Sequence, residues 1–133
     1  MTAGRTKTRL ILIRHGEVEE RYHRVFGGRI DMDLSARGHE QARALAGYVR
    51  RSPIDAIYAS PMRRAQQTLA PLANHCPMPA IVRPEFREVD FGEWTGLTWE
   101  QVHSRFQVSA FEWLDQIEKA SIANAETGTT FRA

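Results

Sequence analysis

The sequence has little of what marks a secreted, membrane-spanning or nucleic-acid-binding protein. Its 133 residues include one cysteine, Cys76, which excludes an internal disulfide and fits a reducing compartment. The apolar run Leu10–Ile13 is far too short for a signal-peptide core or a membrane span. Basic residues outnumber acidic ones by only 18 to 16, without a dense basic tail, which is weak evidence for nucleic acid. These absences favour a cytoplasmic protein with neither nucleic-acid nor membrane partners.

The chain also lacks internal repeats, low-complexity tracts and an obvious linker. A length of 133 residues suits one domain and is too short for two. The hydrophobic fraction of 42% and the charged fraction of 26% are ordinary for a globular protein. We therefore expect a single domain over residues 1–133.

Short apolar segments separated by helical patterns predict alternating strands and helices. Leu10–Ile13 is a continuous apolar run with β-branched residues, which predicts a strand buried on both faces. Residues 54–59 and 81–82 are predicted as two further strands. Strands that alternate with helices are typical of an α/β domain with a mainly parallel sheet.

The helices are predicted from caps, prolines and apolar spacing. Ser35 is a typical N-cap for a helix that should end at Ser52-Pro53. Ser60-Pro61 is expected to open a second helix, and Pro71 to kink or end it. Later helices are predicted from a capping box and from an apolar face, at Thr98 with Gln101 and at Phe111, Leu114 and Ile117.

Arg14, His15 and Gly16 come directly after the first predicted strand. Ligands of open α/β sheets bind beyond the carboxyl ends of the strands, so these residues are expected at the cleft. A neutral imidazole can attack phosphorus, a guanidinium holds phosphate oxygens in a planar fork, and glycine permits close approach. The tripeptide alone does not exclude an ordinary polar loop.

A second pair of basic residues, Arg63 and Arg64, follows the second predicted strand at the start of a helix. This position puts them on the same side of the sheet as His15, next to free helical N–H groups that favour an anion. By itself this arrangement supports only the binding of some anionic ligand.

Four segments in order over residues 10–97 resemble the motifs of the histidine phosphatase superfamily, which includes the phosphoglycerate-mutase-like enzymes. The segments are Leu12-Ile13-Arg14-His15-Gly16, Asp33-Leu34-Ser35-Ala36-Arg37-Gly38, residues 60–68 and residues 88–97. Met32-Asp33 departs from the family pattern, which has a proline there. The resemblance implies a phosphoglycerate-mutase-like three-layer α/β sandwich with a mainly parallel sheet and with neither cofactor nor metal.

The resemblance also implies the roles of the basic residues. His15 would be the nucleophile that becomes a phosphohistidine, and Arg14 and Arg64 would bind the transferring phosphoryl group. Arg64 is preferred to Arg63 because the family motif places its arginine directly before an alanine. Phosphoryl transfer depends mainly on positioning and charge stabilisation, which two arginines supply without a metal.

Glu88 would be the general acid that protonates the leaving oxygen and then the base for the attacking water. Such an acid needs a raised pKa, so Glu88 should be partly desolvated. The residues expected to desolvate it are Phe86, Phe91 and Trp94. Arg21 and Gly28 lie where the family often has substrate-contacting loop residues.

The remaining candidates have simpler interpretations. The histidines without convergent partners are expected on the surface: His23, His39, His75 and His103. Trp94, Trp99 and Trp113 are expected in the core or the cleft wall. No metal-ligand spacing is matched by Asp31, Asp33 and Glu19-Glu20. Cys76 is expected to be a structural thiol.

The sequence departs from the family after residue 97. The family uses a second histidine at the end of a later strand, and His103, the only histidine after residue 75, has no glycine beside it. We expect a carboxyl-terminal truncation, whether by natural fragmentation, a frameshift or the choice of expressed region. A missing strand would uncover sheet edges and helix faces, which favours self-association. Loss of such a phosphate donor typically costs on the order of 10²–10³ in rate, so activity would be low or nil.

Three functions remain open from the sequence. A phosphatase of small phosphate monoesters is favoured over a mutase by Phe91-Gly92-Glu93-Trp94-Thr95-Gly96 and by the short loop between Arg64 and Glu88. Residues 21–28 and Asp33-Leu34 resemble the α-ribazole phosphatase and related broad-specificity group. The third reading is a non-catalytic phosphate-binding remnant, which the missing histidine favours and the retained Glu88 opposes.

Overall fold

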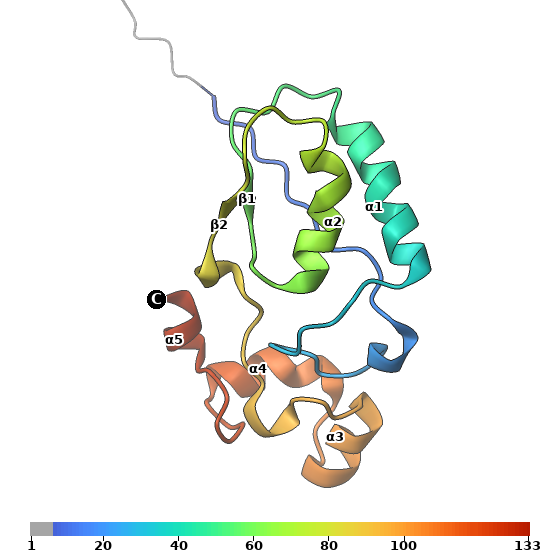
Figure 1. The fold of residues 1–133 in the computed structure, drawn as a ribbon. Helices are drawn as coiled ribbons and strands as arrows, with labels where there is room; N and C mark the ends of the chain where they lie inside the picture. The colour runs from blue at the N-terminus through green and yellow to red at the C-terminus, as the bar shows by residue number, and fades with distance from the viewer. Residues whose placement is uncertain (1–6) are drawn as a thin grey trace, which may run out of the picture.

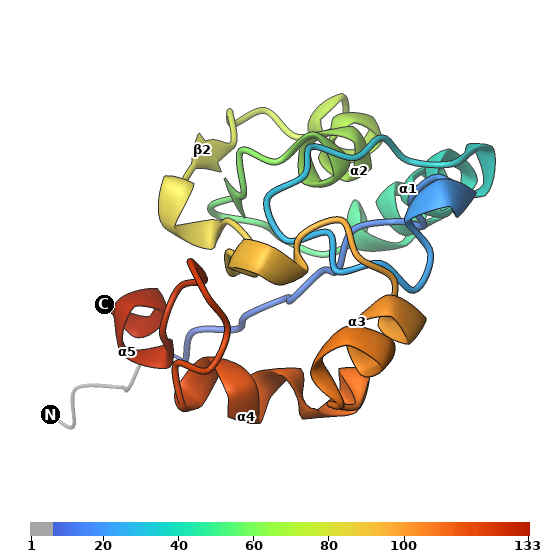
Figure 2. The same cartoon turned by 90° about the horizontal axis from the view of Figure 1, so that it is seen from below.

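The computed structural model describes residues 7–133 and has more helix than strand, with one short two-stranded parallel sheet in the described part (Figure 1). The elements are α1 (Ala36–Val49), β1 (Tyr58–Ala59), α2 (Arg63–Ala73), β2 (Ile81–Val82), α3 (Trp99–Phe106), α4 (Trp113–Glu118) and α5 (Gly128–Arg132). The short 3-10 helices are η1 (Glu20–Tyr22), η2 (Pro84–Phe86), η3 (Gly92–Trp94) and η4 (Ala110–Glu112). The helices α1 and α2 pack together beside the strands, while α3, α4 and α5 form a second group (Figures 1 and 2). Within residues 7–133 no helix has both the length and the apolar character to cross a membrane.

Helix α1 begins as the sequence predicts. The Ser35 hydroxyl accepts a hydrogen bond from the Gly38 N–H at 3.0 Å, which satisfies one of the free donors of the first turn. The buried face of α1 includes Ala46 and Val49, which pack against Leu72 of α2. The helix ends at Val49, ahead of the predicted boundary at Ser52-Pro53.

The parallel pairing of β1 with β2 confirms the α/β class. Tyr58 pairs with Ile81 and Ala59 with Val82, and α2 lies between the strands in the chain. The first of these strands is shorter than the predicted 54–59. Helix α2 begins at Arg63 rather than at Ser60-Pro61, because Met62 is still extended, with ψ of 139°, and serves as the N-cap.

The prediction of a buried strand at Leu10–Ile13 is wrong for the described residues. No strand is formed there, and Leu10 and Leu12 are 78% and 91% exposed. A strand needs a neighbour that pairs with its backbone groups, and within residues 7–133 none pairs with this segment. The segment nevertheless leads directly into Arg14 and His15.

A second core, separate from the one between α1 and α2, lies under α3 and α4. Phe26, Phe91, Trp94 and other apolar side chains surround the fully buried Val102 of α3. The predicted capping box is confirmed, since Thr98 and Gln101 exchange side-chain-to-backbone hydrogen bonds. The apolar face predicted for the following helix is only partly correct: Ile117 is buried, but Phe111, in η4, and Leu114 are exposed. The α5 helix has no counterpart among the predicted elements.

Candidate active site

The loop that carries His15 is clamped between α1 and α2. The Gly16 N–H donates to the Thr68 hydroxyl at 3.0 Å, and that hydroxyl donates to the Arg64 carbonyl at 2.7 Å. A Cβ on Gly16 would lie 2.6 Å from the Gly38 carbonyl oxygen, a distance that only glycine avoids. These contacts fix the position from which the His15 ring extends.

The imidazole of His15 is half-buried and has one nitrogen already engaged. Its Nδ1 lies 2.7 Å from the Gly16 carbonyl oxygen, which can only accept, so Nδ1 carries the proton. The neutral ring therefore has its lone pair on Nε2. Burial, together with the nearby positive charges of Arg64 and Arg14, lowers the pKa of His15 below 6.5, which favours this neutral form near pH 7.

Arg64 is buried in the first turn of α2, with only 4% of its surface exposed. Its two terminal nitrogens donate to the carbonyl oxygens of Ile30 and Gly28, each at 3.0 Å. A guanidinium has five N–H donors, so three remain for a ligand. Arg63 is instead exposed and paired with Asp33 at 3.1 Å, and it does not line the cavity that Arg64 lines.

Gly28 lines the pocket and presents its carbonyl oxygen to Arg64. Its φ of +49° is in the left-handed region, which favours glycine. An added Cβ would lie 3.0 Å from the Val89 carbonyl oxygen and 3.1 Å from the Phe91 ring. In this structure Gly28 thus serves to hold Arg64 in place.

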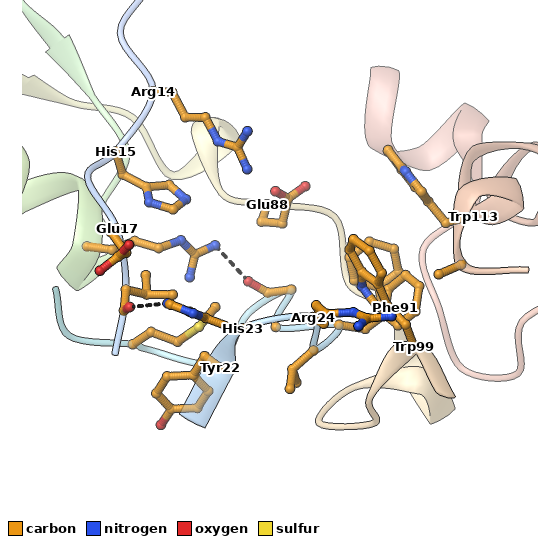
Figure 3. Close-up of a pocket in the computed structure, with 18 of the residues that line it drawn as sticks. Arg14, His15, Glu17, Tyr22, His23, Arg24, Glu88, Phe91, Trp99 and Trp113 are labelled. Atoms are coloured by element: carbon orange, nitrogen blue, oxygen red, sulfur yellow. Dashed lines mark hydrogen bonds between the residues drawn. The ribbon is translucent and has the colours of Figure 1, made fainter. Parts of the chain in front are cut away.

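Glu88 projects into the same pocket as Arg14 and His15 (Figure 3). The expected desolvation is not observed, because the Glu88 side chain is exposed and its Oε1 accepts only a local hydrogen bond from the Val89 N–H at 3.0 Å. The aromatic neighbours do not cover it: Phe86 is itself exposed, and Trp94 is buried in the second core.

Arg21 is not brought into the pocket. Its guanidinium pairs with Glu19 at 2.7 Å and lies over the Tyr22 ring, and it is absent from the described residues that line the cavity. The structure therefore brings together Arg14, His15, Arg64, Glu88 and Gly28 but not Arg21.

Several lining residues are absent from the sequence-based site. They are Glu17, Tyr22, His23, Arg24, Gln41, Trp99, Phe111 and Trp113. The bridge between Val25 and Thr98 brings the loop after η1 against the start of α3, a contact that no local pattern encodes. His23 is exposed, as expected, but it lines the pocket and its Nε2 donates to the Val18 carbonyl at 2.9 Å. The expectation of Trp99 and Trp113 in the core or the cleft wall agrees with their position.

The cavity has a volume of about 690 Å³, which suits a small organic ligand. Figure 3 shows Arg14 and His15 on one side of it, Glu88 between, and Phe91, Trp99 and Trp113 on the other. Within residues 7–133 no group of three histidine, cysteine or acidic side chains is placed to hold a metal ion. The arrangement places the His15 imidazole in one cavity with the guanidinium groups of Arg14 and Arg64 and the carboxylate of Glu88.

Comparison with known proteins identifies the family of the chain. Residues 10–133 match the family model for the histidine phosphatase superfamily (branch 1). Phosphoserine phosphatase 1 of Hydrogenobacter thermophilus is 32% identical over 119 residues, which cover 90% of this chain and 56% of that protein. Glucosyl-3-phosphoglycerate phosphatase of Mycolicibacterium vanbaalenii is 33% identical over 108 residues, covering 80% of this chain and 48% of that one.

Solved structures show the same similarity in the fold. A putative alpha-ribazole-5'-P phosphatase from Escherichia coli superposes with a TM-score of 0.75 and 27% identity, over 90% of this chain and 59% of that one. The phosphoglycerate-mutase-like α/β fold expected from the sequence is thereby confirmed. The chain spans about half the length of these relatives.

Proposed function

Because the chain belongs to the histidine phosphatase superfamily, we propose that it hydrolyses small phosphate monoesters through a phosphohistidine at His15. The observation that carries this proposal is the hydrogen bond from Nδ1 to the Gly16 carbonyl, which leaves the Nε2 lone pair free. Arg14, Arg64 and Glu88 line the same cavity. The relatives are named for different substrates, so the proposal extends to the class of small phosphate monoesters and not to one compound.

The reaction divides into two displacements at phosphorus. His15 Nε2 forms a bond to phosphorus as the ester P–O bond breaks, and protonated Glu88 gives its proton to the leaving oxygen. Water then attacks the phosphohistidine, Glu88 takes a proton from that water, and the P–N bond breaks to release phosphate and neutral His15. The positive charges of Arg14 and Arg64 stabilise the phosphoryl oxygens in both steps.

Phosphate release from p-nitrophenyl phosphate tests the proposal. We expect the chain to release p-nitrophenol and His15→Ala to lose this activity. His103→Ala is the matched control, because His103 is exposed on α3 and does not line the pocket. Rapid quenching followed by intact mass measurement should show one added phosphoryl group on the chain and none on His15→Ala, even where turnover is slow.

The outcomes separate the alternatives. Equal rates for the chain and His15→Ala would exclude His15 as the nucleophile. Phosphate binding without a phosphoenzyme would indicate a binding-only role. Transfer of the phosphoryl group to a second hydroxyl rather than to water would indicate a mutase.

A further inference from the structure

The pocket has a second end that phosphate chemistry does not require. Opposite His15, the cavity is lined by Trp99 and Trp113 (Figure 3). Phe111 also lines the cavity and packs on Trp99. Phe111 is 82% exposed, whereas Trp99 and Trp113 pack against the second core. Large aromatic side chains grouped at a cavity mark a binding surface more often than isolated exposed residues do.

The aromatic side chains are anchored and not loosely attached. Trp99 and Phe111 pack edge to face, with ring centroids 5.5 Å apart. Trp113 packs edge to face on Phe91 at 5.6 Å, and Phe91 packs on Phe26 of the second core at 5.0 Å. A wall of this kind loses little conformational freedom when a ligand binds, so most of the burial energy contributes to affinity.

The charge beside the wall is already neutralised. Arg24 lies over the Trp99 ring at 5.3 Å and pairs with Glu100 at 2.5 Å. A ligand carboxylate beside this guanidinium would meet the negative charge of Glu100. The wall therefore favours an uncharged planar group over an acidic one.

We propose that the rings of Trp99, Phe111 and Trp113 form a subsite for an aromatic leaving group, so that aryl or arylalkyl phosphate monoesters are the preferred substrates. This inference rests on the proposed function, since the phosphate must lie at His15 and Arg64 for the leaving group to reach the wall.

Binding of unreactive phosphonates tests the subsite without requiring turnover. Burial of a phenyl ring predicts that benzylphosphonate binds roughly 10- to 100-fold more tightly than methylphosphonate. 2-Carboxyethylphosphonate should bind no more tightly than methylphosphonate. Dissociation constants can be measured by isothermal titration calorimetry on the full chain.

Phe111→Ala and Leu114→Ala form a matched pair of variants. Both side chains are exposed, but only Phe111 lines the cavity. Phe111→Ala should weaken benzylphosphonate binding about 2- to 12-fold and leave methylphosphonate binding unchanged. Leu114→Ala should alter neither.

Each contrary result has a distinct meaning. Three results would overturn the aromatic subsite and leave the proposed function standing. They are equal affinities for methylphosphonate and benzylphosphonate, tighter binding of 2-carboxyethylphosphonate than of methylphosphonate, and an effect of Phe111→Ala on self-association alone. Tight benzylphosphonate binding that depends on Phe111 but not on His15 or Arg64 would retain an aromatic site and refute the proposed function. Failure of all three phosphonates to bind would refute both.

Discussion

Replacement of Thr68 by valine tests how the nucleophile loop is held. Thr68 is buried, with 6% of its surface exposed, and its hydroxyl is the only link described here between the Gly16 N–H and α2. Valine has nearly the same shape and the same branching at Cβ, so packing and helix propensity change little. The substitution therefore removes hydrogen bonds and almost nothing else.

The expected loss of stability depends on the two backbone groups that lose the Thr68 hydroxyl as a hydrogen-bond partner. The Arg64 carbonyl loses a side-chain donor at 2.7 Å but lies within a helix, where it also has a backbone donor. The Gly16 N–H is buried and loses its acceptor, the Thr68 hydroxyl oxygen. An unsatisfied buried donor costs about 1–3 kcal/mol, so Thr68→Val should lower the free energy of unfolding by roughly 2 kcal/mol.

Urea unfolding followed by tryptophan fluorescence measures this difference, with Thr68→Ser as the control. Serine keeps the hydroxyl and loses one methyl group, which costs about 0.8 kcal/mol. We expect Thr68→Val to be more destabilising than Thr68→Ser, although valine preserves more apolar surface. If Thr68→Val unfolds at the same urea concentration as Thr68→Ser, or at a higher one, the hydroxyl does not hold the loop.

Two further predictions concern the parts of the site that Thr68→Val leaves intact. Gly28→Ala should lower the free energy of unfolding by about 1–2 kcal/mol because of its φ of +49°, whereas Gly47→Ala in α1, where a Cβ meets nothing within 4 Å, should raise it by about 0.5–1 kcal/mol in the same urea assay. Arg14→Gln removes a charge that lowers the pKa of His15, so the NMR titration midpoint of His15 should rise toward 6.5. Since the folded pKa is depressed, the stability present above pH 6.5 is lost as pH falls through the folded pKa, and Arg14→Gln should reduce that loss. An unchanged midpoint in Arg14→Gln, or equal effects of the two alanine substitutions, would contradict this reasoning.

The local features of the fold could be predicted because their causes are local. The N-cap at Ser35 and the capping box at Thr98 and Gln101 depend on residues within one helical turn. The strand predicted at Leu10–Ile13 failed because a strand depends on a neighbour as well as on its own residues. Apolar character alone could not supply the neighbour.

The same distinction divides the site. The choice of Arg64 over Arg63 came from a motif and stays a prediction, which is supported by the two carbonyl oxygens of residues 28–30 that hold Arg64 at the cavity. Arg21, assigned because the family often has substrate-contacting loop residues there, pairs with Glu19 and remains outside the pocket. The desolvation expected of Glu88 failed because the nearby aromatic side chains pack elsewhere.

From the sequence we expect Trp99 and Trp113 in the core or the cleft wall, but we do not predict that they and Phe111 line one end of the cavity. The phosphate end is built from residues 14–68, which are fastened to α1 and α2. The wall is built from residues 91–113, which are fastened to the second core. Because the two ends rest on different cores, substitutions in the wall can alter leaving-group preference while the His15 loop keeps its hydrogen bonds. The geometry thus separates the residues proposed to bind phosphate from those proposed to select the ester.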